Sequence, residues 1–310
     1  MNNITLPENW NDWTLVKQLG RGASGTVYLA ERQTGETTEK SAIKIVTVST
    51  EDEEKNFLFS FFNRPDAQRV YLLQKLQPYL DEIKIMQTLK NSPHIVQLRD
   101  YAILESDDHS TWTVFIRMEY LESLEEHMTR IFPARREMSE LSDEFAAEIK
   151  SLGCDICEAL TACHDKNILH RDIKPANIFW SEKGGYKLGD FDAACFEDSA
   201  ATGNASTGTL YYMAPEVYHG EAGDRTADIY SLGLLLYKYL NRDNVPFVSE
   251  DDASDIVQVK KAIRMRLTGE ELPLPYLKGT IAHPVMQACR FAPDMRFQSA
   301  ALLKAALSEG

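Results

Sequence analysis

The apolar residues of this chain repeat with the two-residue period of a β-strand in much of the first 120 residues and mostly with a helical period afterwards. Residues 13–32 (WTLVKQLGRGASGTVYLAER) hold two alternating runs around a glycine-rich turn, which indicates a β-hairpin. Further strands are predicted at 41–48, 94–104 and 111–120. Between the first two of these, the spacing predicts a helix over about 69–89, with a kink or a break at Pro78. A small sheet-rich part before a larger helical part predicts an α+β fold with two lobes and a cleft at their junction.

Composition and charge argue against several classes of protein. No run of about 18 apolar residues occurs, so no membrane-spanning helix is predicted. The N-terminal segment MNNITLPENWNDW lacks the basic start and apolar stretch of a signal peptide, and we expect a cytoplasmic protein. The net charge of −14, from 33 basic and 47 acidic residues, argues against nucleic acid as a partner, because nonspecific nucleic-acid binding depends on a basic surface.

The five cysteines are too few for this length, and odd in number, for a disulfide framework. Cys154 and Cys157 form a CxxC pattern, which fits either a redox or metal-binding pair or two small apolar residues on the buried face of a helix. A zinc site needs further ligands, and the sequence shows neither a second CxxC nor a nearby ligand cluster. The packing interpretation is therefore favoured.

The glycine-rich turn at 20–25 (GRGASG) fits the pattern GxGxxG, which is a weak signal alone because dinucleotide-binding folds share it. In those folds a helix follows the glycines, whereas here the alternating run TVYL at 26–29 predicts a strand. A hairpin that covers phosphate groups is therefore favoured over a strand–turn–helix cup, with an ordinary hairpin turn as the alternative. Glycines at such a place let backbone N–H groups approach phosphate oxygens without a Cβ in the way.

Three later segments occur in order: HRDIKPAN at 170–177, DFD at 190–192 and APE at 214–216. With the glycine-rich turn, they make the chain resemble the catalytic domain of eukaryotic-type serine/threonine protein kinases over nearly its whole length. They resemble, in turn, the family's catalytic loop, its magnesium-binding triplet and the triplet that closes its activation segment. Asp172 and Asn177 are five positions apart, and Asp172 and Asp190 are eighteen apart, as in the family pattern.

The resemblance implies one kinase domain over 1–310 with a bilobal fold. A small antiparallel sheet and one main helix would form an N-lobe over about 13–118, followed by a hinge at about 119–123. A larger, mostly helical C-lobe would span about 124–308. The resemblance also implies a phosphotransferase that moves the γ-phosphate of ATP to serine or threonine hydroxyls of protein substrates, with Mg²⁺, or alternatively Mn²⁺, as the metal.

The resemblance assigns a lysine–glutamate pair to the nucleotide phosphates. Lys44, in SAIK, would contact the α- and β-phosphates, and Glu82 would be its ion-pair partner. Glu82 is chosen because DEIKIMQTL leads directly into HIVQL, as in the family pattern. Glu54 and the region near Asp81 are competitors, because the stretch between Lys44 and Glu82 is longer than the family usually has.

The resemblance also assigns catalytic and binding roles. Asp172 would accept the proton of the substrate hydroxyl, and Lys174 would stabilise the transferring phosphoryl group. Asn177 and Asp190 would hold the metal ions, which take hard oxygen ligands. Thr209 matches the threonine that joins the catalytic aspartate and lysine in serine/threonine kinases. The nucleotide site would comprise Gly20, Gly22, Ser24 and Gly25 over the phosphates, Val27, Ala42 and Phe179 around the base, Met118 behind it, and backbone groups of Glu119 and Leu121.

Other positions match supporting and regulatory residues of the family. Asp228 resembles the buried aspartate that holds the catalytic loop, and Glu216 and Arg296 resemble a buried ion pair. Arg171 indicates control by phosphorylation of the activation segment, since a phosphate there would give the arginine a partner. The candidate phosphorylation sites are Thr202, Ser206 and Thr207.

The sequence departs from the family pattern in two places. Asp192 stands where the family has glycine, and aspartate tolerates φ > 0 less freely, so the segment is expected to switch less readily. An insertion at about 51–79 contains FLFSFF at 57–62, for which local packing is favoured over a partner or homodimer contact.

Two other functions remain open. A pseudokinase is one, and Asp192 is the only argument for it. A small-molecule phosphotransferase is the other. Lys174 and Thr209 favour a serine/threonine over a tyrosine acceptor, and Thr209 and the segment 214–216 favour a protein substrate because they shape a peptide-docking region.

Overall fold

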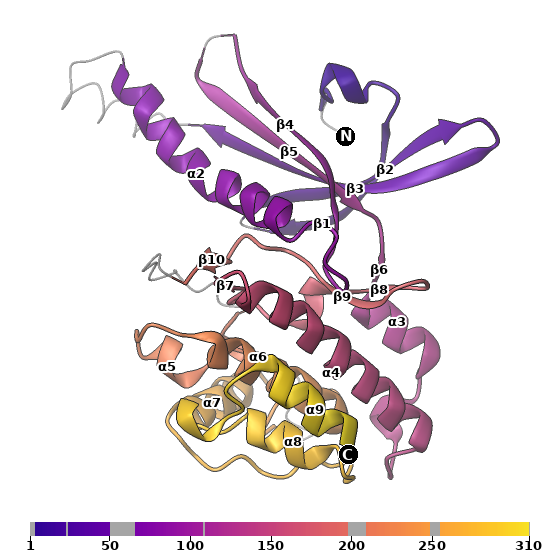
Figure 1. The fold of residues 1–310 in the computed structure, drawn as a ribbon, viewed down its shortest axis with the longest axis vertical. Helices are drawn as coiled ribbons and strands as arrows, with labels where there is room; N and C mark the ends of the chain where they lie inside the picture. The colour runs from indigo at the N-terminus through magenta and orange to yellow at the C-terminus, as the bar shows by residue number, and fades with distance from the viewer. Residues whose placement is uncertain are drawn as a thin grey trace. The chain divides into compact units, whose positions relative to one another are not determined.

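The computed structural model describes residues 4–22, 24–49, 66–107, 109–197, 209–248 and 255–309. It divides into two compact units (Figure 1). The smaller unit comprises Met1–Lys90 and Val96–Tyr120, and the larger comprises Asn91–Ile95 and Leu121–Gly310. The segment 51–65, which includes the predicted apolar run 57–62 and the first part of the proposed homodimer contact, lies outside the described residues.

The described part of the smaller unit is a five-stranded antiparallel sheet with one long helix. In sheet order its strands are β1 (Thr14–Gly22), β2 (Gly25–Thr34), β3 (Thr37–Ser49), β5 (Thr111–Glu119) and β4 (Leu98–Glu105). The short 3-10 helix η1 (Glu8–Trp10) precedes the sheet, and α2 (Asp66–Thr88) packs against β3, β4 and β5 (Figure 1). The β-hairpin predicted at 13–32 is present as β1 and β2.

Strand alternation divides β3 between two environments. Ile43 and Ile45 point into a core with Trp10 and Phe115, whose rings meet edge to face with centroids 6.3 Å apart. Because successive side chains of a strand point to opposite faces, Lys44 lies on the other face of the sheet. One strand therefore supplies both a hydrophobic core and a polar side chain that is directed away from it.

Helix α2 continues through Pro78, so of the kink or break expected from the sequence the break is absent. Proline inside a helix removes one backbone hydrogen bond and costs about 3 kcal/mol. Leu72 and Leu76 before the proline and Ile83 and Met86 after it are all buried. Each such side chain contributes about 1.5–3 kcal/mol when fully buried, so packing on both sides of Pro78 exceeds the cost of the proline.

The larger unit is mostly helical. Its α-helices are α3 (Leu124–Ile131), α4 (Asp143–His164), α5 (Pro215–Tyr218), α6 (Arg225–Leu240), α7 (Ile256–Leu267), α8 (Ala282–Ala288) and α9 (Ala300–Glu309). Its 3-10 helices are η2 (Arg135–Glu137), η3 (Pro175–Asn177), η4 (Thr209–Tyr211) and η5 (Pro293–Met295). Strands β6 (Glu122–Ser123), β8 (Ile178–Ser181) and β9 (Gly185–Leu188) form one small sheet, and β7 (Ile168–Leu169) pairs with β10 (Cys195–Phe196).

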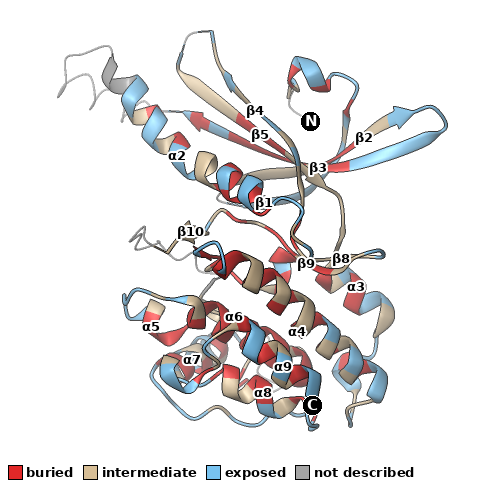
Figure 2. Ribbon diagram, in the orientation of Figure 1, coloured by how far each residue is buried: buried red, intermediate tan, exposed pale blue. Residues whose placement is uncertain are grey.

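Helix α6 forms the centre of this unit. Figure 2 shows it buried along nearly its whole length, as expected of a helix that is apolar on every side. Asp224 caps its N-terminus by accepting a hydrogen bond from the Thr226 N–H at 2.7 Å. Helix α4 packs against both α6 and α9. Helix α6 is therefore a buried support for the loops that surround it.

A short segment before β4 belongs to the larger unit. The His94 carbonyl accepts a hydrogen bond from the Leu188 N–H at 2.8 Å, and Ile95 forms an isolated parallel bridge with Leu188. These backbone contacts with β9 explain why Asn91–Ile95 groups with the larger unit although the residues on both sides group with the smaller one.

All five cysteines are free thiols. Cys157 is fully buried in α4, and the Cys154 Sγ lies 3.6 Å from the Ser308 Oγ of α9. The CxxC pair therefore lies at the packing surface between α4 and α9. Within the described ranges, no helix combines the length and the apolar character needed to cross a bilayer.

Candidate active site

The glycine-rich turn joins β1 to β2 in the smaller unit. Gly22 pairs with Gly25, and Gly20 pairs with Val27. Gly25 has φ +125°, and a Cβ there would lie 2.7 Å from the Ile45 carbonyl oxygen, so glycine is required for the sheet to close. A Cβ at Gly20 or Gly22 would meet no atom within 4 Å. Packing within the described residues therefore does not require glycine at these two positions.

Lys44 and Glu82 form a buried ion pair between β3 and α2. The Lys44 Nζ lies 2.8 and 3.0 Å from the two carboxylate oxygens of Glu82. Their side chains are 6% and 1% exposed. Of the competitors for Glu82, Asp81 accepts a hydrogen bond from the exposed Gln77, and Glu54 lies outside the described residues. The structure therefore brings Lys44 together with the predicted glutamate.

The predicted base-binding residues of the smaller unit share one face of the sheet. Val27 is directly opposite Lys44 across β2 and β3, and Ala42 is directly opposite Met118 across β3 and β5. Because Ala42 is two residues from Lys44, strand alternation places all four side chains on the same face. The Glu119 N–H donates to the Gln97 carbonyl at 3.1 Å, so a contribution of Glu119 to base binding would come from its carbonyl.

The other two predicted base-binding residues belong to the larger unit. Leu121 immediately precedes β6, and Phe179 lies on β8, opposite Ser123 of β6 and Lys187 of β9. The structure thus places each on or beside the small three-stranded sheet.

The catalytic loop collects its polar side chains around Asp172, which is 7% exposed. The Lys174 Nζ lies 2.6 Å from the Asp172 Oδ2, and the Asn177 Nδ2 donates to the same oxygen at 3.0 Å. The Asn177 Nδ2 also donates to the Asp172 carbonyl at 2.9 Å. These bonds orient one carboxylate oxygen and direct the amide nitrogen of Asn177 toward the loop, which leaves its amide oxygen as the donor for a metal.

Asp228 of α6 supports this loop from inside the larger unit. Its carboxylate accepts backbone N–H bonds from His170 at 3.0 Å and Arg171 at 2.8 Å, and it lies 3.0 Å from the His164 Nε2. Burial raises the pKa of Asp228, but the bond from His164 and the neighbouring imidazoles outweigh burial and lower the pKa below its ordinary value. Arg171 has φ 63°, so the carboxylate holds the loop in a left-handed turn.

The segment 190–192 is fastened to the same loop. The Gly189 N–H donates to the Asn177 carbonyl at 2.9 Å. The Asp172 N–H donates to the His170 Nδ1 at 3.3 Å, so Nδ1 is an acceptor and the ring proton is assigned to Nε2. The Nε2 lies 3.1 Å from the Gly189 carbonyl, to which it donates. The buried Phe191 ring packs edge-on against the His170 ring, with the two ring centroids 4.9 Å apart. The position of Asp190 is therefore tied to that of the catalytic loop.

The backbone of this segment shows which of its residues is left-handed, whereas the expectation that the segment switches less readily stays a prediction. The left-handed residue is Asp190, with φ 59°, whereas Asp192 does not have a positive φ. Aspartate in place of glycine therefore causes no backbone strain at position 192 in this conformation.

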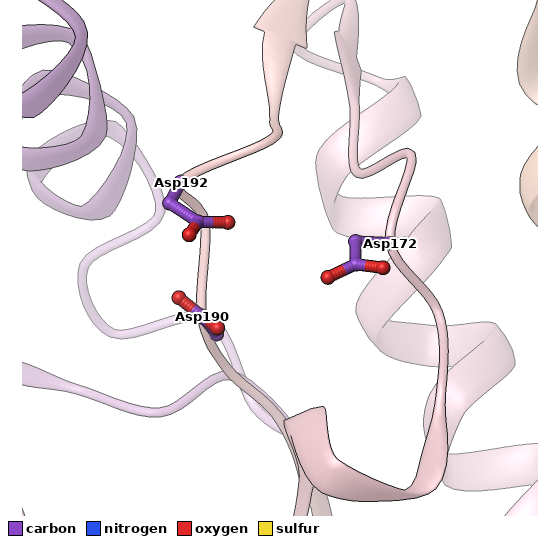
Figure 3. A group of neighbouring side chains, drawn as sticks. All are labelled: Asp172, Asp190 and Asp192. Atoms are coloured by element: carbon purple, nitrogen blue, oxygen red, sulfur yellow. The ribbon is translucent and has the colours of Figure 1, made fainter. Parts of the chain in front are cut away.

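Three carboxylates meet where these loops face one another. Oxygens of Asp172, Asp190 and Asp192 all lie within 4.8 Å of one another, and Figure 3 shows the three groups facing a common space. Oxygens that bind one Mg²⁺ or Ca²⁺ are at most about 4–5 Å apart, and both ions prefer oxygen ligands. The residues present therefore fit a divalent metal. Sequence reasoning treated Asp192 only as a backbone change and missed this carboxylate, although its place two residues after Asp190 was a usable signal.

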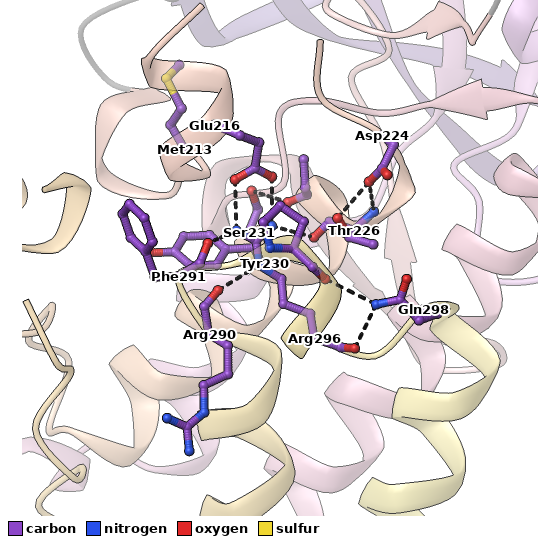
Figure 4. A network of polar contacts seen from close by, with 12 residues as sticks. Met213, Glu216, Asp224, Thr226, Tyr230, Ser231, Arg290, Phe291, Arg296 and Gln298 are labelled. Carbon is purple, nitrogen blue, oxygen red and sulfur yellow. Dashed lines mark hydrogen bonds and ion pairs between the residues drawn. The ribbon is translucent and has the colours of Figure 1, made fainter. Parts of the chain in front are cut away.

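The end of the activation segment is fixed by a second buried pair. Arg296 lies 2.7 and 2.8 Å from the two carboxylate oxygens of Glu216 (Figure 4). The backbone of Thr209 begins η4, before this pair. The predicted phosphorylation sites Thr202, Ser206 and Thr207 lie outside the described residues.

Comparisons with known proteins give one consistent family. The serine/threonine-protein kinase SKM1 of Saccharomyces cerevisiae is 30% identical over 249 residues, which are 76% of this chain and 34% of that protein. The serine/threonine-protein kinase AtPK1/AtPK6 of Arabidopsis thaliana is 26% identical over 277 residues, which are 89% of this chain and 50% of that protein. Aurora/IPL1-related protein kinase 2 of Caenorhabditis elegans is 29% identical over 252 residues, which are 81% of this chain and 70% of that protein.

The chain spans about a third and a half, respectively, of the length of the first two relatives. The family model described as "Protein kinase domain" matches residues 13–304, nearly the whole chain. The predicted bilobal α+β fold is confirmed, with an antiparallel sheet in one unit and mostly helices in the other. A domain of this kind uses ATP and a divalent metal. This chain therefore belongs to the protein kinase domain family.

Proposed function

We propose that this chain is an active protein serine/threonine kinase, with Asp172 as the catalytic base. The observation that carries the proposal is the arrangement around that carboxylate, which is held by Lys174 and Asn177 and has Asp190 within 4.8 Å. A carboxylate in this position accepts the proton of an incoming hydroxyl and orients the hydroxyl oxygen for attack. The ammonium of Lys174, 2.6 Å from the Asp172 carboxylate, would stabilise negative charge of the transferring group.

Lys44 and Glu82 supply the phosphate-binding part of the proposal. The lysine is a compact point charge, and the two oxygens of Glu82 fix its direction. Gly20, Gly22, Ser24 and Gly25 would cover the phosphates, and the base would bind against Val27, Ala42, Met118, Glu119, Leu121 and Phe179.

The metal is proposed to be Mg²⁺, held by Asn177 and Asp190, with Mn²⁺ as a substitute. Both residues offer hard oxygen donors, and the amide nitrogen of Asn177 is already directed to Asp172. When bound, the metal neutralises phosphate charge.

The preference for serine and threonine is supported by Lys174 and Thr209 and by the similarity to serine/threonine-protein kinases such as SKM1. The alternative, a pseudokinase that binds nucleotide without turnover, depended on Asp192. In this structure Asp192 has no strained backbone, and its carboxylate joins those of Asp172 and Asp190.

The test is incubation with γ-labelled ATP, Mg²⁺ and a generic basic protein substrate, followed by phosphoamino-acid analysis. The proposal predicts labelled phosphoserine or phosphothreonine. Nucleotide binding without any transfer would support the pseudokinase instead, and label found only on a small-molecule acceptor would support a small-molecule phosphotransferase.

A further inference from the structure

Asp192 lies in a turn that is fastened on both sides. The Ala194 N–H donates to the Phe191 carbonyl at 3.2 Å, which closes the turn around Asp192. Before the turn, the buried Phe191 ring packs against His170. After it, β10 begins at Cys195 and pairs with β7. The backbone that carries the Asp192 carboxylate is therefore held in one place relative to the catalytic loop.

The charges around this carboxylate call for a divalent cation. Oxygens of Asp172, Asp190 and Asp192 lie within 4.8 Å of one another (Figure 3). Like charges at this separation repel one another. The ammonium of Lys174, 2.6 Å from the Asp172 Oδ2, offsets one of the three negative charges. A cation of charge +2 would offset the other two, so the arrangement favours binding such an ion.

The amide of Asn177 gives an independent indication of a ligand beside these carboxylates. Asn177 is 2% exposed, and its Nδ2 donates to both the carbonyl and the Oδ2 of Asp172. Its Oδ1, in contrast, accepts no hydrogen bond from any residue that the structure describes. A buried amide oxygen is costly to leave without a partner. Because amide oxygens are ligands for hard cations, a metal ion would satisfy it.

We propose that Asp192 is a metal ligand in addition to Asn177 and Asp190, and that it lets the protein bind a divalent cation before the nucleotide. This inference rests on the proposed metal site. Mg²⁺ usually takes one or two carboxylates and completes its shell with waters and substrate phosphates. A further carboxylate supplies one of those ligands from the protein itself, so the affinity for metal without nucleotide rises.

The glycine that the family has at position 192 carries no side-chain oxygen, so this ligand is a feature of the present chain. Asp192 sets the affinity for the metal, whereas the transfer step depends on Asp172 and Asp190. The effect of losing Asp192 should therefore be seen in metal binding, and most clearly when no phosphate groups compete as ligands.

The test titrates the nucleotide-free protein with Mn²⁺ and follows the free ion by electron paramagnetic resonance. Wild type is compared with Asp192→Asn, which keeps the size of the side chain but removes its charge. Glu182→Gln is the matched control, because Glu182 is exposed between β8 and β9 and its loss changes the net charge equally. We expect the Mn²⁺ Kd to rise on the order of tenfold in Asp192→Asn and to stay within about twofold in Glu182→Gln.

Thermal unfolding gives a second readout: Mn²⁺ should raise the Tm of the wild type more than that of Asp192→Asn. A wild-type Mn²⁺ Kd in Asp192→Asn would overturn the inference, as would a wild-type protein that binds no Mn²⁺ until ATP is added. If circular dichroism shows that Asp192→Asn does not fold, Asp192→Gly takes its place and should show the same rise in Kd. Because no nucleotide or substrate is present, the titration decides the role of Asp192 even if phosphoryl transfer, and with it the proposed function, fails.

Discussion

The ion pair of Glu216 and Arg296 allows a quantitative prediction for Arg296→Met. The arginine side chain is fully buried and the glutamate side chain is 8% exposed. Arg296 also donates to the carbonyls of Arg290 and Phe291, both at 2.7 Å, and of Thr226 at 3.2 Å. Methionine would fill much of the space but would leave the carboxylate and three carbonyls without this donor.

Removing one partner of a buried ion pair costs about 3–5 kcal/mol, against a typical total of about 5–15 kcal/mol for a folded domain. A loss of 1 kcal/mol lowers the Tm of a domain of about 150–250 residues by roughly 2–4 °C, so Arg296→Met should lower the Tm by at least about 6 °C. The double variant Glu216→Gln with Arg296→Met should lose less, because no buried charge remains.

The assay is equilibrium urea unfolding, followed by fluorescence and circular dichroism, together with thermal unfolding. Arg290→Met is the control, because Arg290 is exposed and Figure 4 shows its side chain extending away from Glu216. It should change stability by less than about 0.5 kcal/mol. A loss below about 1 kcal/mol in Arg296→Met would refute the reasoning, as would a double variant that is no more stable than the single one.

Three further predictions follow from other parts of the structure. Glu82→Gln removes the charge that faces Lys44 and should weaken ATP binding about tenfold, or ~1.4 kcal/mol, as measured by calorimetry. An unchanged ATP affinity would argue against a role of the Lys44–Glu82 pair in binding the nucleotide. Asp192→Gly should keep the rate of phosphoryl transfer within about threefold of the parent rate, because Asp190 keeps its carboxylate. An inactive parent protein together with an active variant would favour the pseudokinase hypothesis. At pH 8 and in the native state at most two of the five thiols should react rapidly with a disulfide reagent, and all five should react in urea. Burial raises the pKa of the Cys157 and Cys163 thiols, and it raises the pKa of Cys289 to about 12. A raised pKa disfavours the reactive thiolate, so rapid reaction of any of these three thiols in the native protein would contradict the prediction.

The sequence predicts those parts of the fold that a pattern of neighbouring residues specifies, such as an alternating strand or a short motif. The alternation of β1 and β2 and the loop HRDIKPAN are local patterns, and both are found where expected. Strand β3 begins at Thr37, four residues before the predicted run, because the polar stretch 37–40 pairs with β2 although it is exposed. Exposed pairing of this kind leaves no apolar period to detect.

Other features depend on contacts that no local pattern contains. Arg266 lies at helical spacing from the buried Val259 and Ala262, but no local pattern indicates that a charged side chain is buried there or that it donates to the Leu210 and Met213 carbonyls. Asp192 departs from a family motif, and only the side-chain positions show its carboxylate near Asp172. Asn91–Ile95 groups with the larger unit because of backbone hydrogen bonds to β9, and no sequence pattern predicts these bonds.

The measurement that tests the central claim most directly is phosphoryl transfer by the wild type and by Asp172→Asn, at saturating ATP and Mg²⁺, with ATP affinity measured in parallel. Asparagine keeps the size of the side chain and can still bond to its neighbours, but it cannot accept the proton. The account predicts wild-type transfer to a protein hydroxyl, near-unchanged ATP affinity in the variant, and a loss of transfer of about 10²–10⁴-fold. Transfer by Asp172→Asn at the wild-type rate would contradict it.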